Sequence, residues 1–172
     1  MKKRIFIVFL FLSFLANAQN QNVFDIARKG SLQEAIECYK RNPGLINTID
    51  DRKSSPLILA CYRGNTEVAL FLADKVTDVN YNSGKGTAMM AAVMSGNMAI
   101  IEKLIAVKAD LNQTDESGKT ALIYASFFNK TDIAKQLVKA GANKAQKDSD
   151  GRTALDYANF NKNTDLIILL DQ

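Results

Sequence analysis

Small and large apolar residues recur along the chain with a step of about 33 residues. One small position is always alanine: Ala60, Ala92, Ala125 and Ala158. One large position is always leucine: Leu72, Leu104, Leu137 and Leu170. A hydroxyl residue stands five places before each alanine: Ser55, Thr87, Thr120 and Thr153. Because Ser and Thr cap helix starts, each unit is predicted to hold two short helices that meet at the alanine and pack through the leucine.

The loops between these units carry their own signals. Pro56 fits the first turn of a helix, where no backbone donor is needed. Gly118 and Gly151 suit tight turns with positive φ, and Gly141 suits the residue after a helix end. The loop 82–86 is one residue short, so we expect its shape to differ. Each helix pair is too short to be stable alone, so neighbouring units must bury one another.

At these residues the chain resembles the ankyrin repeat family. The segments that carry the resemblance are Ser-Pro-Leu-Ile-Leu-Ala at 55–60, Gly-Lys-Thr-Ala-Leu at 118–122 and Gly-Ala-Asn at 141–143. The resemblance implies an all-α ankyrin-repeat solenoid of about five helix-turn-helix units. The predicted units are 22–50, 51–81, 82–113, 114–146 and 147–172. The histidine of the family's motif is replaced by Ile58, Met90, Ile123 and Asp156, so its side-chain hydrogen bond is expected to be missing.

The first residues are typical of a signal peptide. Lys2, Lys3 and Arg4 precede an apolar run at 5–15, and Ala-Asn-Ala follows at 16–18. The apolar run is too short to cross a membrane, which takes about 20 helical residues. We therefore expect cleavage before Gln19, a mature domain at 19–172 and no membrane insertion after cleavage. The periplasm is favoured over the external medium.

Composition removes several kinds of chemistry. The chain has no His and two Cys, which excludes His-based triads and dyads, His-ligated zinc and four-thiolate metal sites. Loss of the signal peptide takes three of the 22 basic residues and leaves 19 against 18 acidic ones. A mature chain so close to neutrality lacks the basic surface that nucleic-acid binding requires.

The remaining candidate sites have structural interpretations. The Gly-rich segment 83–87 lacks the spacing of a phosphate-binding loop. Cys38 and Cys61 fall in core positions of neighbouring units, which leaves open whether they form a disulfide or stay buried thiols. The turn carboxylates at 115–116 and 148–150 are predicted to hold the turns. No catalytic residue, metal or cofactor is therefore predicted.

The resemblance also implies a concave face that binds another protein. That face is formed by the ends of the first helices and the tips of the turns. The predicted binding residues are Arg52, Tyr62, Arg63, Met94, Lys119, Phe127, Phe128, Arg152 and Phe160. Large apolar residues interspersed with Arg are typical of interface anchors. Whether the aromatic side chains point outward or pack inward stays open at this point.

The function predicted from these features is a non-catalytic exported protein that mediates protein–protein interaction. One alternative, implied by the resemblance, is an accessory or immunity-type protein that protects against oxidants or toxins. Another is an enzyme or small-ligand binder that uses Asp115, Glu116 or Asp156 between the turns. Ile168, in the outward position of the last helix, also suggests self-association through the C-terminal repeat.

Overall fold

The computed structural model describes residues 22–171, so the predicted signal peptide at 1–18 lies outside the described residues. Across 22–171 the regular elements are ten α-helices and one short 3₁₀ helix, with no strand. The prediction of an all-α solenoid is therefore confirmed. Within the same part of the chain, no helix is both long enough and apolar enough to span a bilayer.

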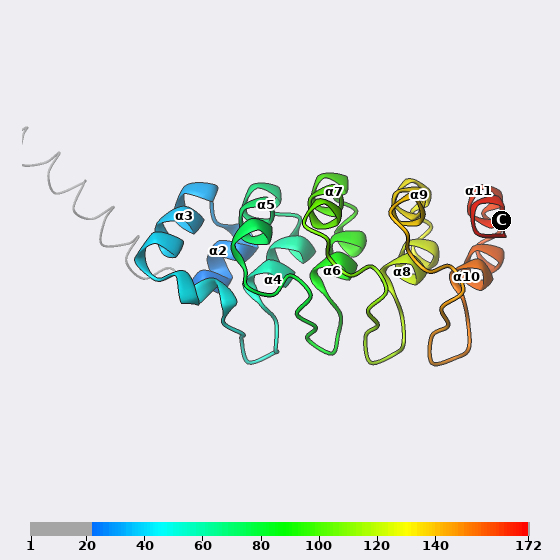
Figure 1. Cartoon of the computed structure of the whole chain (residues 1–172), viewed down its shortest axis with the longest axis horizontal. Coiled ribbons are helices and arrows are strands. Elements are labelled where there is room, and N and C mark those ends of the chain that lie inside the picture. Colours follow the sequence, from blue (N-terminus) through cyan, green and yellow to red (C-terminus); the bar gives the residue numbers. More distant parts are fainter. Residues whose placement is uncertain (1–21, 172) are drawn as a thin grey trace, which may run out of the picture.

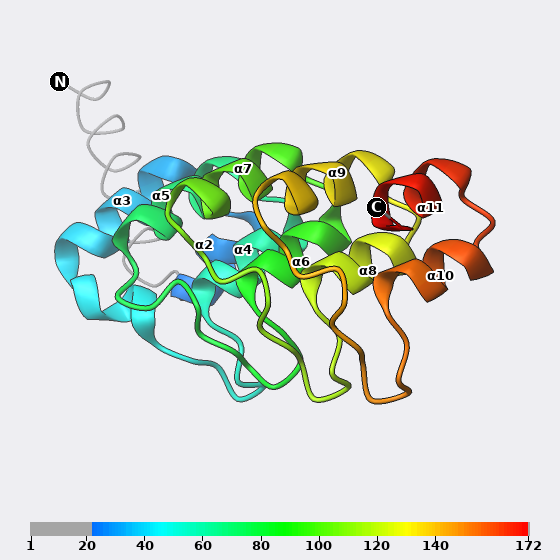
Figure 2. The same ribbon diagram turned by 45° about the vertical axis from the view of Figure 1, so that its right-hand side comes forward.

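The helices form two parallel rows along the long axis of the molecule (Figure 1). The inner row is made of α2 (Val23–Lys29), α4 (Pro56–Arg63), α6 (Ala88–Ser95), α8 (Ala121–Phe127) and α10 (Ala154–Phe160). The outer row is made of α3 (Leu32–Arg41), α5 (Thr66–Lys75), α7 (Met98–Ala106), α9 (Thr131–Lys139) and α11 (Thr164–Asp171). The 3₁₀ helix η1 (Pro43–Asn47) follows α3. Each inner helix turns back into its outer partner, and consecutive pairs stack in chain order (Figure 2).

The hydroxyl residues cap the inner helices as the pattern predicts. The side chains of Ser55, Thr87, Thr120 and Thr153 each accept a hydrogen bond from the backbone N–H three residues on. Pro56 is the first residue of α4, where its missing N–H costs nothing. In α10 the carboxylate of Asp156 also accepts from the backbone N–H of Thr153. The expectation that this position lacks a side-chain hydrogen bond in every unit is therefore wrong for the last unit.

The periodic alanines and leucines form the core between the rows. Ala60, Ala92, Ala125 and Ala158 are completely buried, and the four leucines are at most 5% exposed. Because alanine has the smallest apolar side chain, adjacent inner helices approach closely. Cys38 and Cys61 lie in the same core as buried free thiols. Burial raises the pKa of both thiols, which keeps them protonated at neutral pH.

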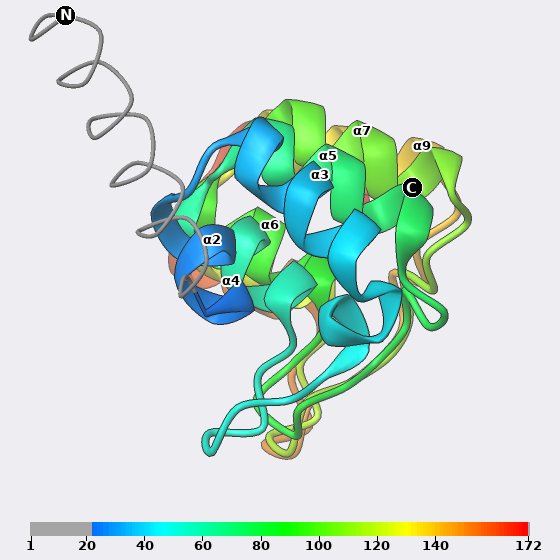
Figure 3. The ribbon, with the colours of Figure 1, turned by 90° about the vertical axis from the view of Figure 1, so that its left-hand side faces the viewer.

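Four long loops project from the inner row on the same side of the molecule (Figure 3). We call their tips fingers 1 to 4, at residues 50–54, 82–86, 115–119 and 148–152. In fingers 1, 3 and 4 an aspartate begins the tip, and its backbone N–H donates to the carbonyl four residues on. Its carboxylate accepts from the backbone N–H groups two and four residues on. The aspartate therefore holds the tip closed.

Finger 2 has a different shape, as predicted. It begins with Asn82, and its tip closes instead between the N–H of Ser83 and the carbonyl of Gly86. Gly86 has a φ of +127°, which few other residues tolerate. The missing residue is not in the loop itself, however. One residue separates Asn80 from Asn82, whereas two separate Asn112 from Asp115, so the prediction placed the deletion wrongly.

A row of asparagines fixes the register between neighbouring units. The side-chain oxygens of Asn47, Asn80 and Asn112 accept hydrogen bonds from backbone N–H groups about 30 residues further on. The donor–acceptor distances are 2.8–2.9 Å. Each unit is thereby tied to the next by a bond that a shifted register would break, and the fingers project in line.

Candidate protein-binding face

The predicted binding residues lie where the inner helices end and where the fingers turn. Five large apolar side chains from four consecutive units are exposed there, and we call them the apolar ridge: Tyr62, Met94, Phe127, Phe128 and Phe160. Their exposed fractions run from 39% for Met94 to 84% for Phe160. The question that the sequence left open is thereby answered, because none of the five side chains is buried.

The middle of the apolar ridge is also packed against itself. The rings of Phe127 and Phe128 meet edge to face with centroids 4.9 Å apart. Phe127 makes a similar contact with Tyr157 at 5.5 Å, and Phe128 stacks on Tyr124 at 6.0 Å. These contacts hold the two phenylalanines in place while leaving about half of each exposed. Phe160 makes no such ring contact within residues 22–171 and is the most exposed of the five.

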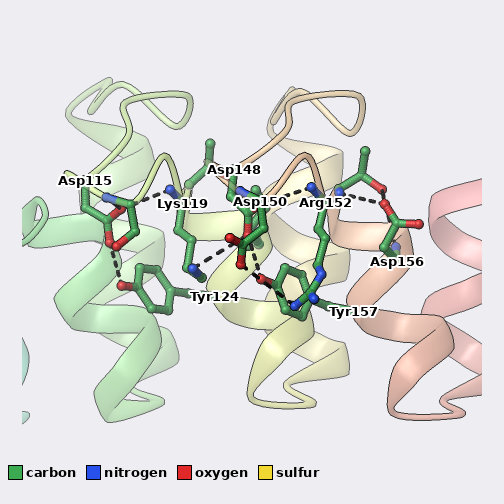
Figure 4. Close-up of polar contacts among 12 residues, drawn as sticks. Asp115, Lys119, Tyr124, Asp148, Asp150, Arg152, Asp156 and Tyr157 are labelled. Atoms are coloured by element: carbon green, nitrogen blue, oxygen red, sulfur yellow. Dashed lines mark hydrogen bonds and ion pairs between the residues drawn. The ribbon is translucent and has the colours of Figure 1, made fainter.

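Two tyrosines of the C-terminal half reach from the inner helices to the fingers (Figure 4). Tyr124 of α8 donates its hydroxyl proton to Asp115 of finger 3. Tyr157 of α10 donates to Asp148 of finger 4 at 2.6 Å. We call these contacts the tyrosine–aspartate pairs. They bind each finger to the helix that follows it, and the phenol rings fill the angle between finger and helix.

Asp148 is the most buried carboxylate of the face, with no exposed side-chain surface. Burial alone would raise the pKa of its carboxyl. Hydrogen bonds from Tyr157 and from the backbone of Arg152 and Asp150, together with the Lys119 charge, outweigh burial and lower the pKa. Asp148 is therefore ionised at neutral pH. In return, burial and the Asp148 hydrogen bond raise the pKa of Tyr157, which keeps its hydroxyl a donor.

Two predicted binding residues of the C-terminal half, Lys119 and Arg152, already contact neighbouring side chains. The ammonium of Lys119 lies 3.6 Å from the carboxylate of Asp148, and only 20% of the Lys119 side chain is exposed. Arg152 lies 3.9 Å from Asp150 and 6.0 Å from the ring centre of Tyr157. Lys119 therefore offers less charge to a partner than the sequence suggests, whereas Arg152 stays exposed.

The N-terminal half of the face has a groove where the C-terminal half has tyrosines. At the positions of Tyr124 and Tyr157, α4 carries Leu59 and α6 carries Ala91. These shorter side chains cannot span to the fingers. The space that remains has a volume of about 560 Å³ and lies against α4, α6 and the first two fingers. We call it the N-terminal groove.

Basic side chains surround this groove and apolar ones line its floor. Arg52, Arg63 and Lys85 are exposed at its edge and form no ion pair within the described residues. Arg28 also lines the groove, but its guanidinium is 3.1 Å from Asp50. The apolar lining is Ile58, Leu59, Tyr62, Met90, Ala91 and Met94. Arg52 and Arg63 were expected on the face, whereas Lys85 and the groove were not.

Sequence reasoning missed the tyrosine–aspartate pairs and the groove for one reason. Both follow from the residue nine places after the first residue of each finger. That position is Tyr after Asp115 and after Asp148, but Leu after Asp50 and Ala after Asn82. The sequence therefore shows a difference between the halves at this position, but only the structure shows that tyrosine reaches the finger and that the shorter residues leave a groove.

Asp115 and Asp156, two of the three carboxylates considered for catalysis, serve the local structure, whereas Glu116 is exposed. Asp115 accepts hydrogen bonds from the backbone of Ser117 and Lys119 and from Tyr124. Hydrogen bonds from Thr153 lower the pKa of Asp156, which is the reverse of the shift a general acid needs. Among residues 22–171, no three His, Cys, Asp or Glu side chains are grouped so that they could hold a metal ion.

The second predicted contact, at the C-terminal end, also has a structural counterpart. Ile168 on α11 is 55% exposed, whereas Ile36 and Leu70 in the corresponding outward positions are half-buried. The last outer helix therefore carries an exposed apolar residue.

Comparison with known proteins agrees with this architecture. The family model described as ankyrin repeats (3 copies) matches residues 23–115 and again 89–172. The chain belongs to the ankyrin repeat family. Ankyrin repeats bind other proteins, and the fold is generally a non-catalytic interaction scaffold.

Two curated relatives illustrate the range of proteins that contain these repeats. The probable E3 ubiquitin-protein ligase XBOS32 of Oryza sativa subsp. japonica is 31% identical over 118 residues, 66% of this chain and 24% of the rice protein. Ankyrin repeat and SAM domain-containing protein 6 of Rattus norvegicus is 32% identical over 113 residues, 64% of this chain and 13% of the rat protein. The ankyrin-repeat chain thus spans a quarter or less of the length of these relatives.

Proposed function

We propose that this ankyrin-repeat protein is an exported, non-catalytic binding protein that holds a protein partner on the face between its inner helices and its fingers. The observation that carries the proposal is the apolar ridge. Five large apolar side chains stand exposed at the same end of four consecutive inner helices. Single exposed apolar residues are ordinary, but a continuous line of them marks an interaction surface.

Burial of this ridge would supply the driving force for binding. Exposed Phe and Tyr side chains lose much of their contact with water when a partner covers them, and the neighbouring arginines orient the partner. The scaffold keeps the ridge rigid, because capped helices and the asparagine row hold consecutive units in register. Little conformational entropy is then lost on association.

The proposal of a non-catalytic role rests on the carboxylates of the face. Asp115, Asp148 and Asp156 all accept hydrogen bonds from their own loops. The ligase named among the relatives is a much longer protein, so its activity is not carried over to this chain.

The proposal of export rests on the sequence pattern at 1–18. It is tested by expressing the full-length chain with a C-terminal tag in a bacterial host and fractionating the cells. Mass spectrometry of the periplasmic product should find Gln19 as its first residue. An intact chain that begins at Met1 and stays in the cytoplasm would refute export.

The binding face is tested by affinity capture from extracts of the native cells. The bait is the purified chain, compared with Phe160→Ser in the apolar ridge and with Ile168→Ser outside it. Both substitutions remove an exposed apolar side chain, so neither should change the melting temperature by more than a few degrees. The proposal predicts a specific partner that Phe160→Ser captures at least several-fold less and Ile168→Ser captures normally. Capture that depends on Ile168 alone would contradict the assignment of the face.

Self-association is a second candidate, favoured by the exposure of Ile168 at the end of the stack. A terminal unit normally presents a polar outer surface. Light scattering of the wild-type chain should then give a mass that rises with concentration, and Ile168→Ser should abolish that rise. A monomeric mass at all concentrations would exclude it.

A further inference from the structure

The N-terminal groove has features that the rest of the face lacks, and they bear on the chemistry of the partner. Its volume of about 560 Å³ falls within the range of sites that enclose a ligand or several side chains of a peptide. The C-terminal half cannot offer such a space, because Tyr124 and Tyr157 occupy the corresponding angle.

The charge of the groove is unbalanced. Residues 22–171 contain 19 basic and 18 acidic side chains, yet the groove edge carries Arg52, Arg63 and Lys85 with no acidic partner. The single carboxylate that lines the groove, Asp50, is paired with Arg28 at 3.1 Å, and the same guanidinium also contacts Asp25 at 3.3 Å. Three positive charges therefore face a partner around one opening, which favours groups of negative charge.

The apolar floor of the groove further restricts which ligands can bind there. Leu59, Met90 and Ala91 line it beneath the charged edge, and Met94 and Tyr62 continue it into the apolar ridge. Methionine side chains adapt to differently shaped apolar groups. An occupant must therefore combine negative charge with apolar side chains. A nucleic-acid strand fits less well, because its affinity depends on many phosphate contacts and three cations supply few.

Resting on the function proposed above, we infer that the N-terminal groove binds an extended acidic segment of the protein partner. Its Asp or Glu carboxylates pair with Arg52, Arg63 and Lys85. An apolar side chain next to them lies on Leu59 and Met94. The exposed ridge then holds the rest of the partner, so that the groove provides specificity by charge and the ridge provides apolar contact area.

The inference is tested with labelled peptides and fluorescence anisotropy. The probe is a short peptide in which Glu alternates with Leu, and the matched probe has Gln in place of every Glu. The wild-type chain should bind the Glu probe at least tenfold more tightly than the Gln probe. Raising the ionic strength from about 0.05 to 0.5 M should reduce that preference, because salt screens exposed charges. Equal affinity for the two probes would overturn the inference.

Charge reversal at the groove provides the first pair of variants. Arg52→Glu with Lys85→Glu should weaken binding of the Glu probe at least tenfold. Lys75→Glu with Lys139→Glu makes the same change in net charge on the outer helices and should leave binding within twofold of wild type. Both side chains of the control pair are exposed, so the stack should stay folded. An equal loss in the two double variants would show that only overall charge matters and would overturn the inference.

A second pair of variants closes the groove by copying the C-terminal half. Asn82→Asp with Ala91→Tyr gives finger 2 and α6 the residues that form the tyrosine–aspartate pairs, and Asn82→Asp alone controls for the added charge. The double variant should lose most binding of the Glu probe and gain a tyrosine with raised pKa, visible in an absorbance titration. Retained binding with the new tyrosine buried would contradict the inference.

Two comparisons separate this inference from the proposed function. If Phe160→Ser prevents capture of the natural partner while Arg52→Glu with Lys85→Glu does not, the binding face stands and the inference about its acidic ligand fails. If neither variant affects capture, both fail. Tighter binding of a single-stranded oligonucleotide than of the Glu probe would also overturn the inference, in favour of a nucleic acid.

Discussion

The two halves of the candidate binding face share one scaffold and differ at the position nine residues after the start of each finger. Finger 2 also begins with Asn82 where the other three fingers begin with aspartate. In the C-terminal half, an aspartate at the start of each finger and a tyrosine nine residues later join finger to helix. In the N-terminal half the tyrosine is replaced by Leu59 or Ala91, and a groove with unpaired cations remains. The difference shows that a repeat scaffold can be closed or opened locally while the periodic alanines and leucines of its core stay the same.

Residues of the same type have different roles in the two halves. Lys119 stabilises a buried carboxylate, whereas Lys85 is exposed beside the groove and has no acidic partner among the described residues. Substitutions in the C-terminal half are therefore expected mainly to reduce stability. Equivalent substitutions in the N-terminal half should mainly change binding.

The largest expected effect follows removal of the finger carboxylate. Asp148→Ala leaves two partly buried backbone donors, the Tyr157 hydroxyl and Lys119 without their acceptor. We expect the free energy of unfolding to fall by about 3 kcal/mol. Asn82→Ala, at the start of finger 2, removes two hydrogen bonds and should cost about 1 kcal/mol. Urea denaturation measures both, and equal losses would break the distinction between the halves.

A smaller effect is expected from removal of one hydroxyl. Tyr157→Phe keeps the ring but leaves the buried Asp148 with one donor fewer, so it should cost about 1–2 kcal/mol. Tyr62→Phe is the matched control, because Tyr62 is exposed and its hydroxyl has no hydrogen-bond partner within the described residues. It should change the unfolding free energy by less than about 0.5 kcal/mol. Equal losses in thermal or urea denaturation would contradict the role of the tyrosine–aspartate pair.

Acid should weaken the C-terminal half through Asp148. Its pKa is lower in the folded chain than the ordinary value of about 4, so its ionised form favours folding. That contribution is fully present above the ordinary pKa and is lost as the pH falls through the folded pKa. Asp148→Asn should therefore show a shallower decrease in stability than wild type between about pH 5 and pH 2. Parallel pH profiles of the two proteins would mean that Asp148 does not cause the loss of stability in acid.

The smallest effect on stability is expected at the edge of the groove. Arg52→Ala with Lys85→Ala should change the unfolding free energy by less than about 0.5 kcal/mol, because both side chains are exposed and unpaired within residues 22–171. Lys119→Ala should cost about 1 kcal/mol, because it leaves the Asp148 carboxylate with less compensation for its burial. Differential scanning calorimetry of the wild type and the two variants measures both losses of stability. A greater loss in the groove variant than in Lys119→Ala would contradict this prediction.

Much of the fold could be predicted from the sequence because each signal is local. A threonine before an apolar turn caps a helix, and an alanine every 33 residues marks the contact between neighbours. The residues of the apolar ridge were placed on the face for the same reason, since Met94 and Phe127 occupy one recurring position, whereas their exposure is known only from the structure.

The groove could not be predicted because it exists only where the side chain of the inner helix is too short to contact the finger. Ala91 looks like any other small core residue until the distance from α6 to finger 2 is known. The shape of finger 2 adds to this, since one residue fewer after Asn80 changes which backbone groups pair at the tip. Burial of Lys119 against Asp148 is likewise a contact across two fingers, which no spacing within one unit reveals.

Hydroxyl-radical footprinting of the bound chain shows whether the partner lies on the face of inner helices and fingers. Met94 lies on the apolar ridge, and Met98, a few residues later, lies on outer helix α7, so one residue type reports on both sides. The account predicts that bound partner lowers oxidation of Met94 and Phe160 several-fold and leaves Met98 unchanged. Protection of Met98 with Met94 still fully oxidised would place the partner on the outer helices and contradict the account.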